Sequence, residues 1–245
     1  IADINPGSAD SNPSGLTAYR NAIIFAADNG QQGIELWRSD GTATGTALVK
    51  DINPLPGQSS APSDFIVLGN VLYFIADDGS HGRELWRSDG TAGGTFLVRD
   101  SIAGAGHPPA LELVAGIDRL YFTAADANGY QIWRSDGTAA GTSRVTALAY
   151  SHEYRPEQLI TVDNDLFFVL DDGQKHLYHS DGTAGGTFAL HLAFPFFDVR
   201  EPTWLTSAPG RLFFSGDSST FGREPYAALT ALLRLSTPRL DLPNS

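Results

Sequence analysis

The stretch RELWRSDGTAGGT at residues 83–95 decides the fold, because it recurs almost unchanged along the chain. Close copies read IELWRSDGTATGT at 34–46, YQIWRSDGTAAGT at 130–142 and KHLYHSDGTAGGT at 175–187, and a degenerate copy reads REPYAAL at 223–229. A catalytic motif normally occurs once per active site, whereas a phrase copied at a regular spacing indicates a repeat architecture. The sequence therefore says more about fold than about function.

The aromatic residue at the third position of ELW sets the period of the repeat. It falls at positions 37, 86, 133, 178 and 226, so successive spacings are 49, 47, 45 and 48 residues. Five repeats of this length account for almost all of the 245 residues. We therefore expect one domain over 1–245, with repeats at about 16–52, 65–101, 111–147, 158–193 and 203–237.

Each repeat has the pattern of four short antiparallel strands. A first strand such as 16–20 is followed by a turn rich in Gly, Asn and Asp, and the next strand, such as 22–27, is apolar on both faces. The ELW segment is the third strand, and SDGTxxGT joins it to a fourth such as 47–52. Asp40 can accept backbone N–H groups there and Gly41 can adopt a positive φ, so we interpret the phrase as a hairpin that fixes the register of strands three and four.

Four antiparallel strands followed by a polar crossing to the next apolar strand are typical of a β-propeller blade. We predict an all-β fold, a five-bladed β-propeller. Residues 1–6, IADINP, repeat the end of a fourth strand, VKDINP at 49–54. We therefore expect the N-terminal strand to help complete the last blade and close the ring.

These copies resemble the ELWxxDGT repeat family of bacterial surface and exported proteins, and the resemblance covers essentially the whole chain. It implies a propeller-like protein that is exported to the periplasm, the cell surface or the medium, and it implies no defined activity. Tyr178 replaces Trp in the fourth copy, and the fifth has Pro225-Tyr226 and no DGT turn, so the last two repeats depart from the pattern. The length and blade number are also similar to five-bladed tachylectin-type lectins, an analogy of architecture alone.

Composition argues against several classes of partner. The chain has 16 Lys and Arg against 28 Asp and Glu, a net charge of -12, and such an acidic surface repels nucleic acid and anionic membranes. No apolar run approaches the ~20 residues of a transmembrane helix. The chain has no cysteine, which excludes disulfides and thiolate metal sites. Because Ile1 is not a translation start, we expect a processed mature chain or an excised fragment.

The recurring aromatic residues are the first candidates for a site that binds a ligand or partner. An exposed aromatic ring beside a carboxylate can stack on a sugar, as a lectin with sites between blades requires. An aromatic residue that recurs in the middle of a strand also suits packing between blades, which we favour. These candidates are Trp37, Trp86, Trp133 and Tyr178.

A second group of candidates lies where the repeat becomes irregular. Phe194, Phe196 and Phe197 form an apolar cluster in a crossing that is otherwise polar. Two interpretations stay open at this point. The cluster is either a docking patch for a protein partner or a plug for the irregular last blade.

Other polar residues carry weaker signals. The repeated Arg38, Arg87 and Arg134 suit either a ring of anion-binding groups or pairing with nearby carboxylates such as Asp40. The acidic turns near Asp28 could hold Ca²⁺, but ordinary hairpin turns explain them and the EF-hand spacing is missing. The six histidines form no zinc signature, and no G-x-S-x-G or P-loop sequence occurs. We expect no cofactor and no metal, with Ca²⁺ the one exception to test.

Together these observations predict a binding or assembly module that is not an enzyme. The expected partner is a protein, either another protein or a second copy of the chain. The alternative is a lectin that binds glycans between its blades, and the third is an enzyme with its site at the central tunnel. A lectin requires exposed aromatic residues between the blades, whereas an assembly module requires an apolar patch at the irregular ones.

Overall fold

A computed structural model describes residues 2–101, 111–126, 129–146, 155–171, 173–190, 193–194, 197–218 and 221–229. These residues form strands and no helix, so the all-β prediction is confirmed. It follows that the described part of the chain holds no helix of the length and apolarity needed to span a membrane. The chain divides into two compact units, residues 1–127 with 134–143, and residues 128–133 with 144–245.

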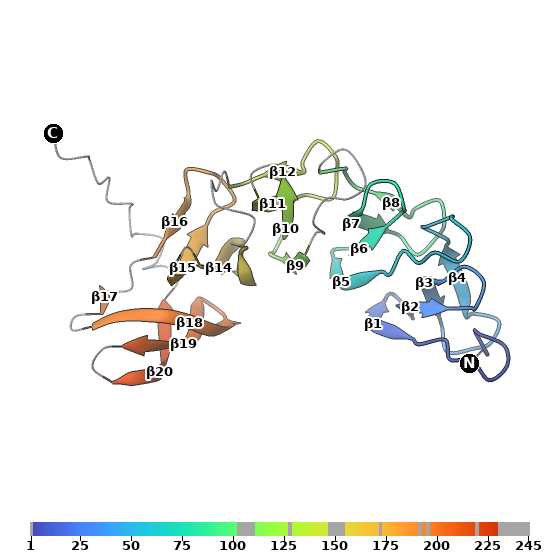
Figure 1. Ribbon diagram of the computed structural model, residues 1–245, viewed down its shortest axis with the longest axis horizontal. Helices are drawn as coiled ribbons and strands as arrows, with labels where there is room; N and C mark the ends of the chain where they lie inside the picture. The colour runs from blue at the N-terminus through green and yellow to red at the C-terminus, as the bar shows by residue number, and fades with distance from the viewer. Residues whose placement is uncertain are drawn as a thin grey trace. The chain divides into compact units, whose positions relative to one another are not determined.

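The first two repeats each form a four-stranded antiparallel sheet with strands in chain order (Figure 1). The first sheet comprises β1 (Ser14–Tyr19), β2 (Ala22–Asp28), β3 (Ile34–Ser39) and β4 (Ala47–Lys50). The second comprises β5 (Ser63–Leu68), β6 (Val71–Asp77), β7 (Arg83–Ser88) and β8 (Phe96–Leu97).

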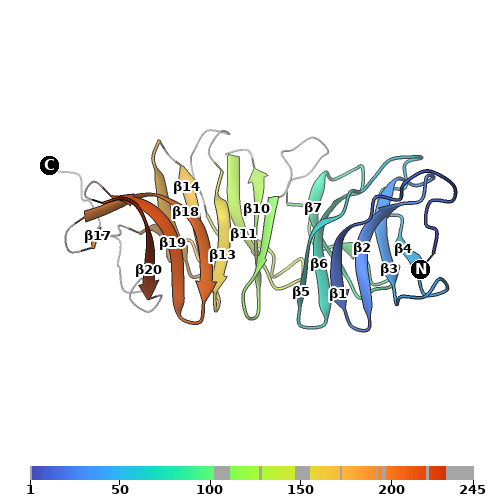
Figure 2. The same cartoon turned by 90° about the horizontal axis from the view of Figure 1, so that it is seen from below.

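The later repeats give three more four-stranded sheets, and the strands of each lie alongside one another (Figure 2). The third comprises β9 (Leu111–Ala115), β10 (Leu120–Asp126), β11 (Gly129–Ser135) and β12 (Ser143–Arg144). The fourth comprises β13 (Glu157–Val162), β14 (Asp165–Asp171), β15 (Lys175–Ser180) and β16 (Thr187–Ala189). The fifth comprises β17 (Ala193–Phe194), β18 (Phe197–Ala208), β19 (Arg211–Ser218) and β20 (Gly222–Leu229).

The fifth sheet differs from the expected strand pattern. Its long strand β18 starts at Phe197, well before the expected start at Thr203. Its outermost strand is β17, which precedes β18 and pairs with it through Phe194 opposite Phe197. The expected fourth strand at 231–237 lies outside the described residues. The strand β17 and the start of β18 therefore come from chain that the repeat pattern assigns to the end of the fourth repeat and to the crossing after it.

The expected closing strand at the N-terminus is not found, and that prediction is wrong for residues 2–6. Residues 2–13 contain no strand, and Ile4 packs against Phe25 and Trp37 of the first sheet. Asn5 lies beside Gly30 in the β2–β3 turn, just as Asn53 lies beside the corresponding turn of the second sheet. The DINP segment therefore packs onto the sheet that follows it in sequence, at both of its occurrences.

The repeated SDGTxxGT phrase forms a hairpin held by a fixed set of hydrogen bonds, as predicted. In the second sheet, Asp89 Oδ1 accepts from the Thr91 backbone N (2.9 Å) and from Thr91 Oγ1 (2.6 Å). Thr91 Oγ1 in turn accepts from Gly94 N (3.0 Å), and Thr95 Oγ1 donates to Thr91 O (2.6 Å). The same bonds recur in the hairpins after β3, β11 and β15. The phrase recurs in four copies because each of its polar residues has a hydrogen-bond partner within the hairpin.

The two glycines of this hairpin give a matched pair of substitutions. A Cβ at Gly94 would overlap the carboxylate of Asp89, whereas a Cβ at Gly93 would meet nothing within 4 Å. We expect Gly94→Ala to lower the free energy of unfolding by ~1–3 kcal/mol, because the carboxylate must swing away from its donors. We expect Gly93→Ala to change it little or to raise it slightly. Urea unfolding of the two variants measures both effects, and equal stabilities would contradict the assigned geometry.

The first strand of the first four sheets and β18 of the fifth contain equivalent residues in the left-handed region, with φ between 48° and 65°, and β18 has a further one at Glu201, with φ 49°. The pairing register shifts next to each equivalent residue, so each is a β-bulge, which increases the local twist of the strand. A glycine takes this backbone conformation freely, but four of the five residues are not glycine and carry strain. The five residues are Gly15, Asp64, Glu112, Gln158 and Trp204.

Neighbouring sheets pack face to face within each unit. In the first unit, Ile24 and Leu36 of the first sheet contact Phe74 and Trp86 of the second. In the second unit, the corresponding positions Phe167 and Leu177 of the fourth sheet contact Phe214 and Tyr226 of the fifth. We call the face at the Ile24 and Leu36 positions the leading face of a sheet, and the face at the Phe25 and Trp37 positions its trailing face. A leading face packs on the trailing face of the next sheet along the chain.

Candidate functional site

The recurring aromatic residues lie inside the packed sheets. Trp37, Trp86, Trp133 and Tyr178 are 8%, 5%, 6% and 9% exposed. Trp37 pairs across strands with Phe25, and the Tyr178 ring stacks on Phe168 with 5.2 Å between centroids. Rings buried to this extent offer no open face to a sugar, which favours the packing interpretation over the lectin interpretation.

The irregular phenylalanine cluster lies at the start of the fifth sheet. Phe194 is in β17 and Phe197 begins β18, and the two are paired across these strands. Phe196 lies outside the described residues. The backbone thus brings Phe194 and Phe197 together on one hairpin, and a binding role for the three residues stays a prediction.

The repeated arginines have different environments from one sheet to the next. Arg87 Nη1 donates to the carbonyl of Gly137 in the third-sheet hairpin (3.0 Å), and its guanidinium lies 5.2 Å from the centroid of the Phe96 ring. Arg87 therefore links two sheets of the first unit and does not simply pair within its own hairpin. Arg99 adds to the same link by donating to the carbonyls of Ala139 (3.2 Å) and Thr142 (2.8 Å).

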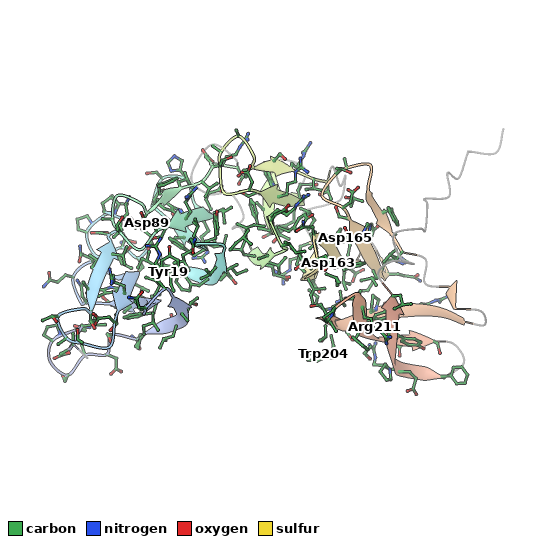
Figure 3. The ribbon with its side chains drawn as sticks, turned by 180° about the vertical axis from the view of Figure 1, so that it is seen from behind. Tyr19, Asp89, Asp163, Asp165, Trp204 and Arg211 are labelled. Atoms are coloured by element: carbon green, nitrogen blue, oxygen red, sulfur yellow. The ribbon has the colours of Figure 1, made fainter. Side chains whose placement is uncertain are left out.

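Arg38 instead lines a polar cavity of about 290 Å³ between the first and second sheets. Tyr19 and Asp89, labelled in Figure 3, line the same cavity from the two sheets, together with Arg20 and Asp40. A related cavity of about 300 Å³ in the third sheet is lined by Arg134, Asp136, Asp118 and Arg119. Each cavity combines guanidinium groups with carboxylates, which suits a small ligand rich in hydroxyl groups.

The hairpin carboxylates that line these cavities are held in their ionised form. Hydrogen bonds from Thr42 lower the pKa of Asp40, with a smaller contribution from the charge of Arg38. Hydrogen bonds from Thr91 and Thr138 lower the pKa values of Asp89 and Asp136 in the same way. The hairpins therefore present fixed negative charges at neutral pH.

These pKa shifts predict an acid-sensitive contribution to stability. A carboxyl whose pKa is lower in the folded state stabilises the fold above its unfolded pKa of 3.8, and that contribution is lost as the pH falls through the folded value. We expect the urea midpoint of the wild type to fall between pH 5 and pH 2.5. A variant with Asp40, Asp89 and Asp136 changed to Asn should show a smaller fall, and an identical pH dependence would contradict this role.

The acidic turns between strands two and three are ordinary hairpin turns. Asp28 Oδ1 accepts from Gly30 N (2.7 Å), and Asp77 Oδ1 accepts from Gly79 N (2.8 Å). Asp78 holds His81 with an Oδ2 to Nδ1 distance of 2.8 Å. Within the described ranges, no three Asp, Glu or His side chains gather in a way that could hold a metal ion. The expectation about Ca²⁺ stays a prediction.

A larger, mainly apolar cavity lies on the trailing face of the first sheet. Its volume is about 560 Å³, and Ile4, Leu16, Ile23 and Phe25 supply apolar walls. In the second sheet, the positions that correspond to Ile23 and Phe25 are covered by the leading face of the first sheet. The cavity thus lies where a preceding sheet would pack.

The fifth sheet carries a second apolar surface, which the sequence interpretation missed. Trp204, Phe213, Phe221 and Leu229 are 81%, 39%, 59% and 48% exposed. Trp204 lies on β18, and Arg211 starts the neighbouring strand β19 (Figure 3). Along β19, buried and more exposed residues alternate from Arg211 to Ser218, whereas the five central residues of β6 and β14 are all buried. Among the residues that the structure describes, one face of the fifth sheet therefore has no other sheet of its own unit packed on it.

Comparison with known proteins shows the fold and leaves the family open. No family model matches the chain, and no curated protein matches its sequence. A solved structure of puromycin hydrolase, an S511A mutant complexed with PGG, matches with a TM-score of 0.62 and 14% identity over 93% of this chain and 38% of that one. A second puromycin hydrolase structure matches with a TM-score of 0.52 and 15% identity, over 86% and 34%. The GH74 xyloglucanase from Xanthomonas campestris matches with a TM-score of 0.48 and 14% identity, over 90% and 37%.

These similarities support a β-propeller-like, all-β fold. The chain spans 38% and 34% of the lengths of the two puromycin hydrolase chains that it matches. The prediction that the chain is not an enzyme is contradicted, because these structural neighbours are enzymes. At 14% and 15% identity the likeness shows the fold alone.

Proposed function

We propose that the five sheets are the five blades of a propeller and that the chain is an exported module for protein–protein assembly. Neighbouring blades pack face to face within each unit, and the irregular last blade presents an apolar surface to a protein partner. The surface comprises Trp204, Phe213, Phe221 and Leu229, and the strand that carries Trp204 begins in the hairpin of Phe194 and Phe197. Exposed apolar patches of this kind mark interaction sites on soluble domains.

The exposure of Phe213 carries this proposal. The equivalent position in β2, β6, β10 and β14 is occupied by Ile24, Tyr73, Phe122 and Phe167. Those four residues are 1%, 4%, 1% and 0% exposed, whereas Phe213 is 39% exposed. A large apolar residue at a position that is buried in every other repeat points to a surface that is covered in the working complex.

Glycan binding is the second candidate, and the polar cavities favour it. The cavity beside Tyr19 and Asp89 combines an aromatic residue, two arginines and two carboxylates, which is suitable chemistry for a polyol. The Tyr19 hydroxyl, however, donates to the carbonyl of Asn70 (2.6 Å), and its ring is only 4% exposed. We therefore rank this function below assembly.

Affinity capture on two kinds of ligand separates these functions. The immobilised chain is exposed to a cell-envelope protein extract and, in parallel, to a glycan array. We expect specific retention of protein by the wild type, its loss in Phe213→Asp, and no retention of glycans. Val67→Asp is the matched control, because Val67 is also 39% exposed but lies on the second sheet. Glycan binding, or protein retention that does not depend on Phe213, would contradict the proposal.

A further inference from the structure

The place where one sheet meets the hairpin of the next differs between the two interfaces of the first unit. Between the second sheet and the third-sheet hairpin, side chains of the second sheet occupy the space beside Gly137. Arg87 Nη1 donates to the Gly137 carbonyl (3.0 Å), and the Tyr73 hydroxyl lies so close that a Cβ on Gly137 would overlap it. A guanidinium and a phenol therefore complete this interface.

The corresponding place between the first and second sheets is the polar cavity of about 290 Å³. Ile24 stands there at the position of Tyr73 and is the shorter side chain. Arg38 stands at the position of Arg87, but among the described residues its guanidinium has no hydrogen bond or ion pair. Both residues line the cavity beside Gly90 of the second-sheet hairpin. The two groups that complete the second interface thus have no counterparts in the first.

Four charged side chains line this cavity, two of each sign. They are Arg20, Arg38, Asp40 and Asp89. The Arg20 guanidinium lies 5.1 Å from the centroid of the Tyr19 ring, and within the described part of the chain it also has no hydrogen bond or ion pair. Thr42 and Thr91 donate only to the Oδ1 atoms of the two carboxylates. The cavity therefore offers charged donors from both arginines and charged acceptors from both Oδ2 atoms.

The third-sheet cavity, of about 300 Å³, contains the same kinds of residue, but its guanidinium groups are already bonded. Arg119 Nε donates to Asp118 Oδ1 (2.9 Å), and Arg134 Nε donates to Ser143 Oγ (3.4 Å). Unbonded charges of both signs are therefore a property of the first interface and not of every repeat.

We propose that the cavity between the first and second sheets binds a zwitterion, an α-amino acid whose carboxylate meets the two guanidinium groups and whose ammonium meets Asp40 and Asp89. Guanidinium and carboxylate groups form strong charge-assisted hydrogen bonds. An anion alone would be repelled by the aspartates, and a cation alone by the arginines. A neutral polyol would displace water from these charges without supplying opposite ones, which is costly.

Two further features define the ligand and the site. Ala22 and Ile24 supply an apolar part of the cavity wall, which suits a short aliphatic side chain. Every residue that lines the cavity belongs to the first unit. The site is therefore independent of the apolar surface on the fifth sheet, and the two can be tested separately.

Isothermal titration calorimetry with L-valine and its blocked forms tests the class of ligand. The wild type should bind a single L-valine. N-acetyl-L-valine lacks the ammonium and L-valinamide lacks the carboxylate, so each should bind at least ~10-fold more weakly, because each leaves two protein charges without a partner. Equal affinity for either blocked form, tighter binding of glucose than of L-valine, or no binding of L-valine would overturn the inference.

Variants of the chain test the location of the site. Arg38→Gln and Asp89→Asn should each weaken L-valine binding at least ~10-fold. Arg134→Gln and Asp181→Asn, which change the equivalent residues of the third and fourth sheets, should leave it unchanged. Asp89 and Asp181 accept the same hairpin bonds, so their variants should unfold at similarly lowered temperatures, and only the binding should differ. Binding that survives both site variants, or that is lost in both controls, would overturn the inference.

Discussion

Trp86→Ala should lower the free energy of unfolding by ~3–5 kcal/mol. The indole is 5% exposed and lies in the cluster that joins the first and second sheets, where it packs with Tyr19, Ile24 and Phe74. The Lys50 ammonium also lies 5.9 Å from its ring centroid. Truncation would leave a cavity at an interface between sheets, and the loss would be a large fraction of the ~5–15 kcal/mol of a typical domain.

The matched control is a tryptophan of the same chain on an open surface. Trp204 is 81% exposed, so Trp204→Ala should change the free energy of unfolding by less than ~0.5 kcal/mol. Urea denaturation followed by circular dichroism measures both variants. A stable Trp86→Ala variant that loses ligand binding would make the recurring tryptophan a binding residue and refute its role in packing.

Glu35→Ala should destabilise the fold by about 3 kcal/mol or more, because Glu35 holds the crossing to the second sheet. The carboxylate is fully buried and accepts three hydrogen bonds, from Ile52 N (2.8 Å), Ser60 N (2.8 Å) and Ser60 Oγ (2.6 Å). Its removal leaves two buried backbone N–H groups without these acceptors. Glu35→Gln should have a smaller effect, since one amide oxygen can still accept.

The pH dependence of this effect has a definite sign. Burial raises the pKa of Glu35, against the opposing hydrogen bonds from Ser60 and Ile52. A raised pKa in the folded state means that the contribution of Glu35 is fully present below its unfolded pKa of 4.5 and is lost as the pH rises through the folded value. The deficit of Glu35→Ala relative to wild type should therefore be larger at pH 4 than at pH 7. A deficit that grows towards pH 7, or one below ~0.5 kcal/mol, would contradict this account.

The regular parts of the repeat could be predicted from sequence because their signals are local. The turn from Asp89 to Thr95 closes through bonds between residues at most four positions apart, so its chemistry is readable in a single copy. The sequence predicts the strand β2 at 22–27, and the structure has it at Ala22–Asp28. The prediction succeeds because this apolar run has no competing interpretation. Local chemistry repeated several times gives redundant information about the fold.

Features that depend on contacts between distant segments could not be predicted in this way. The bulge in the first strands has no shared residue type, because Gly15, Asp64 and Trp204 occupy equivalent positions and only the glycine signals a left-handed backbone. The N-terminal DINP segment looked like a closing strand, but its packing against Phe25 decides where it lies. The exposure of Phe213 could not be predicted, because the sequence around it matches the sequence around the equivalent buried residues of the other repeats. Alignment of the second strands identifies the position, and the structure is needed to show that it is open.

The most direct measurement of the central claim is the thiol reactivity of Phe213→Cys, because the chain has no other cysteine. In the isolated chain the thiol should react quickly with a maleimide, and it should become protected when the cell-envelope protein extract supplies the partner that covers the fifth-sheet face. The thiol of Phe167→Cys, at the corresponding buried position, should react slowly throughout, and that of Phe96→Cys, on a residue 45% exposed, should react at a constant rate. A Phe213→Cys thiol that is protected in the isolated chain, or equally reactive with and without the extract, would contradict an assembly surface at this sheet.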